Sequence, residues 1–172
     1  MRRVRYCVAM SLDGYIAGPA DESDWIIMDP SFDFASLWAS FDTLVMGRRT
    51  FEQALRHGRG LAMPGIRVYV FSRTLFAEAH KDVTVLTDVS KVAELREQKG
   101  KDIWLFGGGV LFGSLLSEGL VDTVEVTIVP VLLGAGRPLV SGHPSCAALK
   151  LVSTDRTPMG LVTLKYEVMR PA

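Results

Sequence analysis

Cysteine and histidine are scarce in this sequence, which contains two Cys and three His among 172 residues. Cys7 and Cys146 lie far apart and fit no spacing typical of a metal site or a disulfide framework. We therefore expect no metal, and we interpret Cys7, which lies within an apolar run, as a small core residue. The histidines are isolated from one another, so no chemistry is assigned to them.

Net charge is also absent, because 19 basic residues balance 19 acidic residues. A nucleic acid or an anionic membrane is therefore not an expected partner. Arginines outnumber lysines by 13 to 6, which suits phosphate recognition but fits compositional drift better.

Long apolar runs are missing as well. The run that follows the basic residues 1–5 covers only residues 6–10, which is shorter than a signal peptide or a bilayer span requires. We expect a cytoplasmic protein.

Strand and helix patterns alternate in the first part of the chain, whereas the last third contains strand patterns only. Strands are expected at residues 4–10, 43–46, 67–71, 83–87, 102–106, 122–129, 149–157 and 162–169. Helices are expected at residues 34–40, 50–55, 89–99 and 110–119. The sequence therefore predicts one α/β domain over residues 1–172, with three α/β/α layers, a mixed, mostly parallel sheet and an antiparallel C-terminal hairpin.

Three consecutive glycines separate an apolar run from an amphipathic segment within residues 103–112. This pattern predicts a buried strand, a turn without side chains and a helix. Glycine lets a ligand approach the backbone closely, and the first turn of a helix offers free N–H groups and a positive dipole end to a phosphate. A tight turn with close helix–strand packing explains the same glycines equally well.

Two further strand ends carry groups that bind anions. Arg48 and Arg49 precede Thr50, which can cap the next helix. Cations oppose the dipole at a helix N-terminus, and a bound phosphate would resolve this conflict. Ser72 and Arg73 follow another strand and suit a phosphomonoester, although a solvated loop explains them too. Because ligands bind at strand ends in α/β sheets, we predict one anion site.

Two loops complete the pattern. Residues 9–18 form a polar, glycine-bearing loop after the first strand, and Asp13 within it is a candidate acid or substrate anchor. An Asp-Gly turn is the simpler explanation of Asp13. Residues 130–144 are rich in Gly and Pro, which predicts a long surface loop between late strands.

Taken in order, these segments resemble the dihydrofolate reductase-like superfamily and, within it, the reductase domain of bacterial riboflavin biosynthesis. The matching segments are Met10-Ser11-Leu12-Asp13-Gly14-Tyr15-Ile16-Ala17, Asp24-Trp25, Val45-Met46-Gly47-Arg48-Arg49-Thr50-Phe51, Phe71-Ser72-Arg73, Phe106-Gly107-Gly108-Gly109 and Val126-Thr127-Ile128-Val129-Pro130-Val131-Leu132-Leu133-Gly134 with Gly136. The resemblance covers most of the chain. It implies a small stand-alone reductase with a dihydrofolate reductase-like fold and NADPH as the hydride donor.

The same resemblance assigns cofactor-binding residues. Gly47, Arg48 and Thr50 match the segment that holds the pyrophosphate. Ser72 and Arg73 match contacts to the adenosine 2′-phosphate, which favours NADPH over NADH. The full set that the resemblance assigns to the cofactor is Ala9, Ile16, Gly47, Arg48, Thr50, Ser72, Arg73, Gly107, Gly108 and Gly109.

The substrate side matches less completely. Dihydrofolate reductases carry an acidic residue that binds the pterin at the start of the helix before the Met-Gly-Arg segment. Here that position falls near Ser31, with Asp33 two residues away. Like the riboflavin branch, the chain has Ser-Leu-Asp-Gly, and this resemblance makes Asp13 the better candidate for a catalytic or substrate-orienting carboxylate. Aromatic candidates for the pocket wall, which fit a core equally well, are Trp25, Phe34 and Trp38.

The sequence thus predicts hydride transfer from NADPH to a C=N or C=O carbon of a small heterocycle, similar to 5-amino-6-(5-phosphoribosylamino)uracil reductase. Alternatives are a nucleotide-binding protein without turnover, a pterin reductase of the dihydrofolate reductase type and a phosphate-binding transferase. The transferase is weakened because no P-loop lysine motif and no G-x-G-x-x-G occurs. Apolar residues 123–133 are expected to form an exposed edge that pairs in a homodimer.

Overall fold

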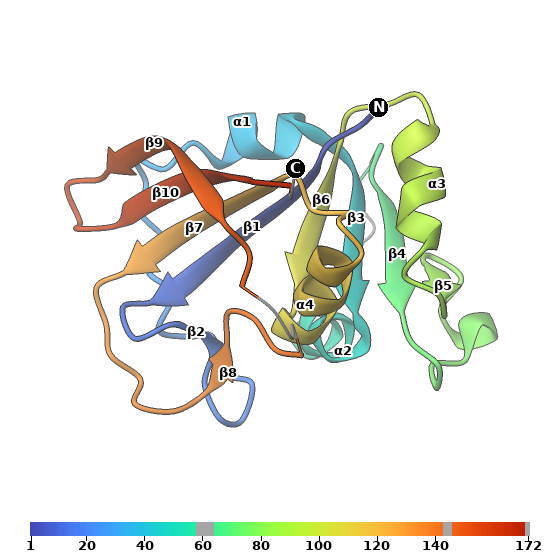
Figure 1. Cartoon of the computed structure of the whole chain (residues 1–172). Helices are drawn as coiled ribbons and strands as arrows, with labels where there is room; N and C mark the ends of the chain where they lie inside the picture. Colours follow the sequence, from blue (N-terminus) through green and yellow to red (C-terminus); the bar gives the residue numbers. More distant parts are fainter. Residues whose placement is uncertain (58–63, 143–145, 171–172) are drawn as a thin grey trace.

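An eight-stranded sheet forms the centre of the molecule, with the strand order β5-β4-β3-β6-β1-β7-β10-β9 (Figure 1). The computed structural model describes residues 1–57, 64–142 and 146–170. The parallel strands are β1 (Val4–Ser11), β3 (Phe41–Gly47), β4 (Arg67–Phe71), β5 (Thr84–Leu86), β6 (Asp102–Gly107) and β7 (Thr123–Val129). β10 (Val162–Val168) and β9 (Leu149–Arg156) extend the sheet as an antiparallel hairpin. The predicted sheet is confirmed.

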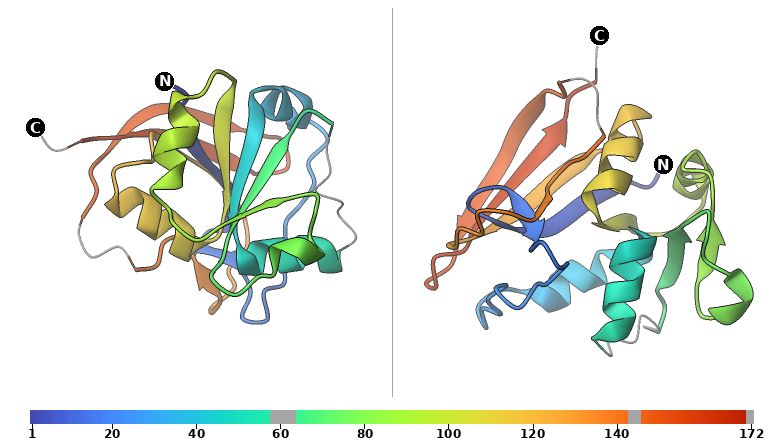
Figure 2. Two further views of the ribbon diagram at one scale, coloured as in Figure 1. Left: turned by 90° about the vertical axis from the view of Figure 1, so that its right-hand side faces the viewer. Right: turned by 90° about the horizontal axis from the view of Figure 1, so that it is seen from below.

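Helices cover both faces of this sheet (Figure 2). They are α1 (Phe34–Ala39), α2 (Arg48–Arg56), α3 (Lys91–Glu97) and α4 (Gly109–Ser117), with a 3-10 turn at Ala77–Ala79. Val92 of α3 and Phe112 of α4 belong to one buried cluster with Tyr6 of β1. Phe51 of α2 belongs to a second buried cluster, on the opposite face, with Cys7 of β1. Because side chains alternate along β1, its neighbouring residues serve separate cores, and the predicted three layers are confirmed.

The sheet is covered unevenly on the face that carries α1 and α2. These helices lie over β3, β4 and β6, where Leu44, Val70 and Trp104 are buried beneath them. β1, β7 and β10 lie beyond them, and their residues on this face include Glu125 and Thr127, which are only partly buried. This uncovered part of the face is open to a ligand.

A second, two-stranded sheet crosses the carboxyl ends of the main strands. β2 (Tyr15–Ala17) pairs antiparallel with β8 (Arg137–Pro138). The sequence pattern did not indicate either strand, because each is too short to show periodicity. The predicted surface loop at residues 130–144 therefore contains a paired strand, and residues 143 and 144 lie outside the described part.

The predicted dimer edge needs correction. Residues 123–129 form β7, which is paired on both sides by β1 and β10 and is therefore no edge. The sheet ends instead at β9, where Leu149, Leu151 and Val152 are 44–52% exposed. Within the described residues, no helix is long and apolar enough to cross a membrane.

Candidate active site

A cavity of about 1090 Å³ opens at the carboxyl ends of β1, β3, β4 and β6, on the face that carries α1 and α2. Pockets for single small ligands have volumes of about 300–1000 Å³, so this one has room for a dinucleotide and a second molecule. Predicted site residues that line it are Ala9, Ile16, Phe34, Trp38, Gly47, Arg48, Thr50, Ser72, Arg73, Gly107, Gly108 and Gly109. Asp13 and Trp25 do not line it.

Two helices begin at the cavity without a side-chain cap. α2 starts after Gly47 and α4 starts after Gly108. Neither glycine has a side chain that could accept a hydrogen bond from the N–H groups of the first helical turn. The N–H groups of such a turn lack partners within the helix and carry the positive end of the helix dipole. Thr50 lies beside the glycine turn, since a Cβ on Gly108 would stand 3.5 Å from its hydroxyl. These donors together suit an anion.

The three consecutive glycines at residues 107–109 have different surroundings: Gly109 packs closely against β8, whereas Gly108 borders the cavity. A Cβ on Gly109 would stand 2.5 Å from the Pro138 carbonyl oxygen, so no larger residue fits there. Gly107 has a φ of +135°, which residues with a side chain rarely adopt. Gly108, by contrast, has room for a Cβ and leaves its backbone bare beside the cavity. The packing interpretation therefore holds for Gly109, and contact of a ligand with Gly108 stays a prediction.

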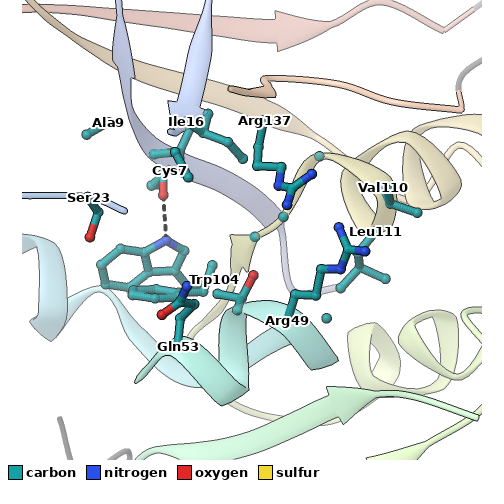
Figure 3. A pocket seen from close by; sticks show the side chains of 18 of the residues that line it. Cys7, Ala9, Ile16, Ser23, Arg49, Gln53, Trp104, Val110, Leu111 and Arg137 are labelled. Atoms are coloured by element: carbon teal, nitrogen blue, oxygen red, sulfur yellow. Dashed lines mark hydrogen bonds between the residues drawn. The ribbon is translucent and has the colours of Figure 1, made fainter. Parts of the chain in front are cut away.

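Arginines gather on the side of the cavity formed by β3 and β4. Arg48 pairs with Glu52, one turn later in α2, at 3.0 Å. Arg49 extends from α2 toward the start of α4, near Val110 (Figure 3). Arg73 follows β4 and lines the same side. Arg49 belongs with the predicted site residues, although the resemblance did not single it out.

Ser72 is already engaged in the turn after β4. Its Oγ accepts hydrogen bonds from the backbone N–H groups of Thr74 (3.1 Å) and Leu75 (2.9 Å). The hydroxyl hydrogen remains free to donate to a ligand. Ser72 therefore both shapes this turn and offers one donor to the cavity.

Arg137 of β8 approaches the glycine turn from the other side of the cavity (Figure 3). It forms an ion pair with Asp21, and its Nη2 donates to the Pro19 carbonyl at 3.2 Å. The Asp21 carboxylate raises the pKa of Arg137 through a hydrogen bond and its charge. Sequence reasoning missed this residue because it lies in a segment interpreted as a surface loop.

The cavity has two halves: the first is the side with the helix starts and arginines described above, and the second lies over the uncovered face of β1, β7 and β10. This face is the floor of the second half. Ala9, Thr127 and Thr163 are aligned across the three strands by their pairing register. The hydroxyls of Thr127 and Thr163 lie 2.9 Å apart, and either can be the donor. Because two hydroxyls share one hydrogen bond, one hydroxyl hydrogen remains for a ligand. The alternation along residues 122–129 predicts a solvated face, and this face is the cavity floor.

Trp104 marks the boundary between the two halves. Its indole N–H donates to the Cys7 carbonyl at 2.9 Å, so the ring is fixed against β1 (Figure 3). Trp38 packs on it with ring centroids 4.6 Å apart. Burial raises the pKa of the Cys7 thiol, which keeps the thiol protonated at neutral pH. The interpretation of Cys7 as a core residue therefore holds, although it also reaches the cavity floor.

Apolar residues form the wall that faces this floor. They come from the loop that precedes α1 and from α1 itself, and they are Ile26, Ile27, Met28, Phe32, Phe34, Leu37 and Trp38. Flat ligands bind well between such side chains and a strand floor. Phe34 and Trp38 were predicted in this role, whereas Trp25 turns away and donates to the Glu22 carbonyl at 3.3 Å.

Glu125 is the carboxylate of the cavity floor, and sequence reasoning did not select it. Arg5 binds it through two nitrogens, Nε to Oε1 at 2.7 Å and Nη2 to Oε2 at 2.8 Å. Burial alone would raise the pKa of Glu125, but the hydrogen bonds and charges of Arg5, Lys165 and Thr123 together outweigh it and lower the pKa. The side chain is therefore ionised at neutral pH.

Asp13 lies outside the cavity and connects two loops instead. Its carboxylate accepts hydrogen bonds from the Ser11 hydroxyl (2.6 Å) and from the backbone N–H groups of Leu133 (3.1 Å) and Gly134 (2.7 Å). The hydrogen bond from Ser11, followed by those from the backbone, lowers its pKa. A carboxylate held in this way fixes the loop, and the catalytic or substrate-orienting role of Asp13 stays a prediction.

The pterin-binding position of dihydrofolate reductases has no counterpart on α1. Asp33 caps this helix, with Oδ1 accepting from the Ser36 N–H at 2.9 Å, and it does not line the cavity. Ser31 hydrogen bonds to Asp29. The start of α1 therefore contributes no acidic group to the cavity.

Comparison with known proteins agrees with this architecture. The sequence pattern of the RibD C-terminal domain matches residues 2–163. YyaP, an uncharacterised protein of Bacillus subtilis, is 33% identical over 96% of this chain and 94% of its own length. A second uncharacterised protein of that organism, YwjB, is 27% identical over 90% of this chain and 92% of its own length.

Solved structures give the same picture. A protein of Shewanella sp. PV-4, assigned provisionally to riboflavin biosynthesis, is 29% identical and superposes with a TM-score of 0.81, covering 99% of this chain and 100% of its own. A pyrimidine reductase-like protein of Corynebacterium diphtheriae shares the fold, with 18% identity and a TM-score of 0.75 over 99% of this chain and 93% of its own. So does a bifunctional deaminase and 5-amino-6-(5-phosphoribosylamino)uracil reductase of Thermotoga maritima, with 17% identity and a TM-score of 0.71 over 98% of this chain and 57% of its own.

Proposed function

Because this chain belongs to the RibD C-terminal domain family, we propose that it is a reductase that uses NADPH to reduce a C=N or C=O bond in a small heterocyclic substrate. The observation that carries this proposal is the pair of uncapped helix N-termini at one cavity, with the bare glycine turn between them. A pyrophosphate fits this arrangement of backbone donors. Arg49 and Arg73 add the cations that such a group requires.

The adenosine end of the cofactor belongs at the end of β4. Ser72 and Arg73 are a hydroxyl and a guanidinium in neighbouring positions, which suits a phosphomonoester such as the 2′-phosphate of NADPH. NADH lacks that phosphate. The proposal therefore includes a preference for NADPH.

When bound, NADPH supplies the hydride, and the protein orients the reactants and excludes water. Ala9 and Ile16 border the cavity beside the floor, where the nicotinamide end belongs by resemblance. Thr127 and Thr163 offer one hydroxyl donor to the substrate. The apolar wall before and within α1 excludes water, which strengthens electrostatic interactions inside the cavity.

The first test is a titration of the protein with NADPH and with NADH, followed by tryptophan fluorescence. Trp104 lies in the cavity lining and reports binding. We expect clear preference for NADPH. Failure of both nucleotides to bind would remove the basis of the proposal.

A protein that binds NADPH without turnover is the second candidate. NADPH absorbance, measured in the presence of 5-amino-6-(5-phosphoribosylamino)uracil, related pyrimidines or dihydrofolate, distinguishes the two candidates. A reductase lowers the absorbance with one of these substrates, and a protein without turnover leaves it unchanged. Oxidation of NADPH with a pyrimidine supports the reductase. Oxidation with dihydrofolate would favour the pterin reductase, which Asp33 does not support because it caps α1.

Assembly as a homodimer and a cytoplasmic location remain proposals. β9 is the edge at which a second copy would pair, because its apolar residues Leu149, Leu151 and Val152 are exposed. Light scattering should give twice the chain mass. A monomeric mass at micromolar concentration would contradict the dimer.

A further inference from the structure

We propose that Glu125 determines substrate specificity, and that its carboxylate selects a planar ring whose edge presents N–H donors, as an amidine or a guanidine does. This inference rests on the proposed function, which assigns the arginine side of the cavity to the cofactor.

The position of Glu125 places it next to the reacting end of the cavity. Its register partners are Cys7 on β1 and Lys165 on β10. The next row on the same face is Ala9, Thr127 and Thr163. Glu125 therefore lies one row deeper than the floor residues beside which the nicotinamide belongs. A ring that lies on Thr127 directs one edge toward Glu125.

The donors that now contact the carboxylate decide whether it can accept from such an edge. Oε1 accepts from Arg5 Nε (2.7 Å) and Thr123 Oγ1 (3.1 Å), and Lys165 Nζ lies 3.4 Å from it. Oε2 accepts from Arg5 Nη2 at 2.8 Å, and the neighbouring Cys7 thiol also hydrogen bonds to the carboxylate. A thiol is a weak donor. An N–H group of a ligand can therefore replace it at the carboxylate.

Charge is divided between the two halves of the cavity. The charged residues that line it in the described part of the chain are Asp21, Arg48, Arg49, Arg73, Glu125 and Arg137. Asp21 and Arg137 pair with each other. The remaining arginines lie at the ends of β3 and β4, and β7 is three strands from β3, or about 14 Å at the usual strand spacing. The floor itself thus presents a carboxylate.

The cations that neutralise Glu125 come from the strands on either side of it, Arg5 from β1 and Lys165 from β10. Arg5 and Lys165 are 13% and 31% exposed as side chains, and neither lines the cavity. Arg5 is further held by Asp102 at 3.5 Å and by the ring of Phe41. They keep the carboxylate ionised without offering a site for an anionic group. A ligand on the floor therefore meets a carboxylate acceptor opposite the apolar wall.

The experiment compares four planar probes that differ in charge: benzamidine, benzamide, benzoate and phenyl phosphate. Each is titrated by NMR into protein saturated with NADP⁺. We expect benzamidine to bind about tenfold more tightly than benzoate or phenyl phosphate, because its N–H groups donate to an ionised acceptor. In Glu125→Gln the ratio between benzamidine and benzoate should fall to near unity.

The matched control is Glu167→Gln. Glu167 also pairs with an arginine, Arg3 at 3.2 Å, but it lies on the exposed surface and outside the cavity. This variant should keep the preference of the unmodified protein. Preference for benzoate or phenyl phosphate, equal binding of all probes, or retention of the preference in Glu125→Gln would overturn the proposal.

Two further measurements separate misfolding of the variant and failure of the proposed function from failure of the role of Glu125. Thermal unfolding establishes whether Glu125→Gln folds, and the probe series on the unmodified protein tests the proposal even if it does not. Titration with NADPH on the same sample tests the proposed function separately. Binding of NADPH without any charge preference overturns the role of Glu125 alone, whereas charge preference without NADPH binding overturns the reductase and retains the role of Glu125.

Discussion

The two halves of the cavity differ in the groups that they present to a ligand: one presents mainly backbone groups and the other presents side chains. The half at the N-terminal ends of α2 and α4 is mainly backbone: two helix starts and a glycine turn, with arginines around them. The half above β1, β7 and β10 consists of side chains, among them Glu125, Thr127 and Thr163. A backbone site suits a group that never changes, such as a pyrophosphate. A side-chain site is changed by single substitutions, which fits the role in substrate choice that we propose for it.

The largest effect that separates the halves is expected at Gly109. In Gly109→Ala the new Cβ collides with the Pro138 carbonyl, 2.5 Å away, and displaces either α4 or β8. We expect a loss of about 1–3 kcal/mol in the free energy of unfolding. The same displacement moves the N–H donors of α4, so NADPH affinity should fall at least about tenfold, which corresponds to roughly 1.4 kcal/mol of binding free energy. Denaturant unfolding and nucleotide titration measure both.

Gly47→Ala is the control for unfolding stability alone. A Cβ at Gly47 approaches no atom closer than 3.9 Å, and its φ of −80° is ordinary. Stability should change by less than about 1 kcal/mol. Equal destabilisation by the two substitutions would show that Gly109 is not held by the close approach of β8.

A strong and selective effect on the cofactor half is expected at Arg73. Arg73→Ala should weaken NADPH binding by about tenfold or more, since a hydrogen bond to a charged group contributes about 1.5–3 kcal/mol. NADH binding should stay within about twofold, because NADH has no 2′-phosphate for the lost guanidinium to contact. Calorimetric titration of both nucleotides checks this.

Arg156→Ala, which removes an exposed arginine of β9, is the matched control for Arg73. It should change neither affinity. If Arg73→Ala weakens NADPH and NADH alike, the arginine acts on the pyrophosphate or on the fold, and the assigned contact to the 2′-phosphate is wrong.

A moderate effect on turnover alone is expected at Asp13. Asp13→Asn leaves one acceptor oxygen for the donors on Ser11, Leu133 and Gly134, so the connection between the two loops weakens. We expect turnover to fall about fivefold, as for the loss of about 1 kcal/mol of hydrogen bonding. NADPH affinity should be unchanged. Steady-state kinetics and titration measure the two effects, and unaltered turnover would leave Asp13 as a turn residue only.

The smallest effect is expected in the pH dependence of stability. The folded protein lowers the pKa of Glu125, so its stabilising contribution is complete above the unfolded pKa of about 4.3 and fades as the pH falls through the lower folded value. The difference in melting temperature between the unmodified protein and Glu125→Gln should thus be constant from pH 7 to about pH 5 and shrink below about pH 4. A difference that grows on acidification would contradict the direction of the shift.

Local patterns were sufficient for the first half of the cavity. Gly47, Thr50 and Gly107 occur in short stretches where an apolar strand ends in glycine and a helix begins, and such stretches specify their own geometry through sequence-local turns and helix starts. The order of strands and helices likewise followed from alternation of patterns, because a parallel strand buried on both faces is apolar throughout. The sequence by itself therefore determined the fold class and the helix starts and glycine turn that border the cavity.

The other half was decided only by the tertiary structure. Glu125 is one polar residue in an alternating strand, and nothing nearby in the sequence shows that Arg5 binds it or that α1 leaves its face uncovered. Asp13 shows the same dependence, since this carboxylate in a loop motif is held by backbone groups about 120 residues away, at Leu133 and Gly134. Strand register and the placement of loops join residues distant in the chain, and these long-range pairings decide which polar side chains line a cavity and which hold the structure together.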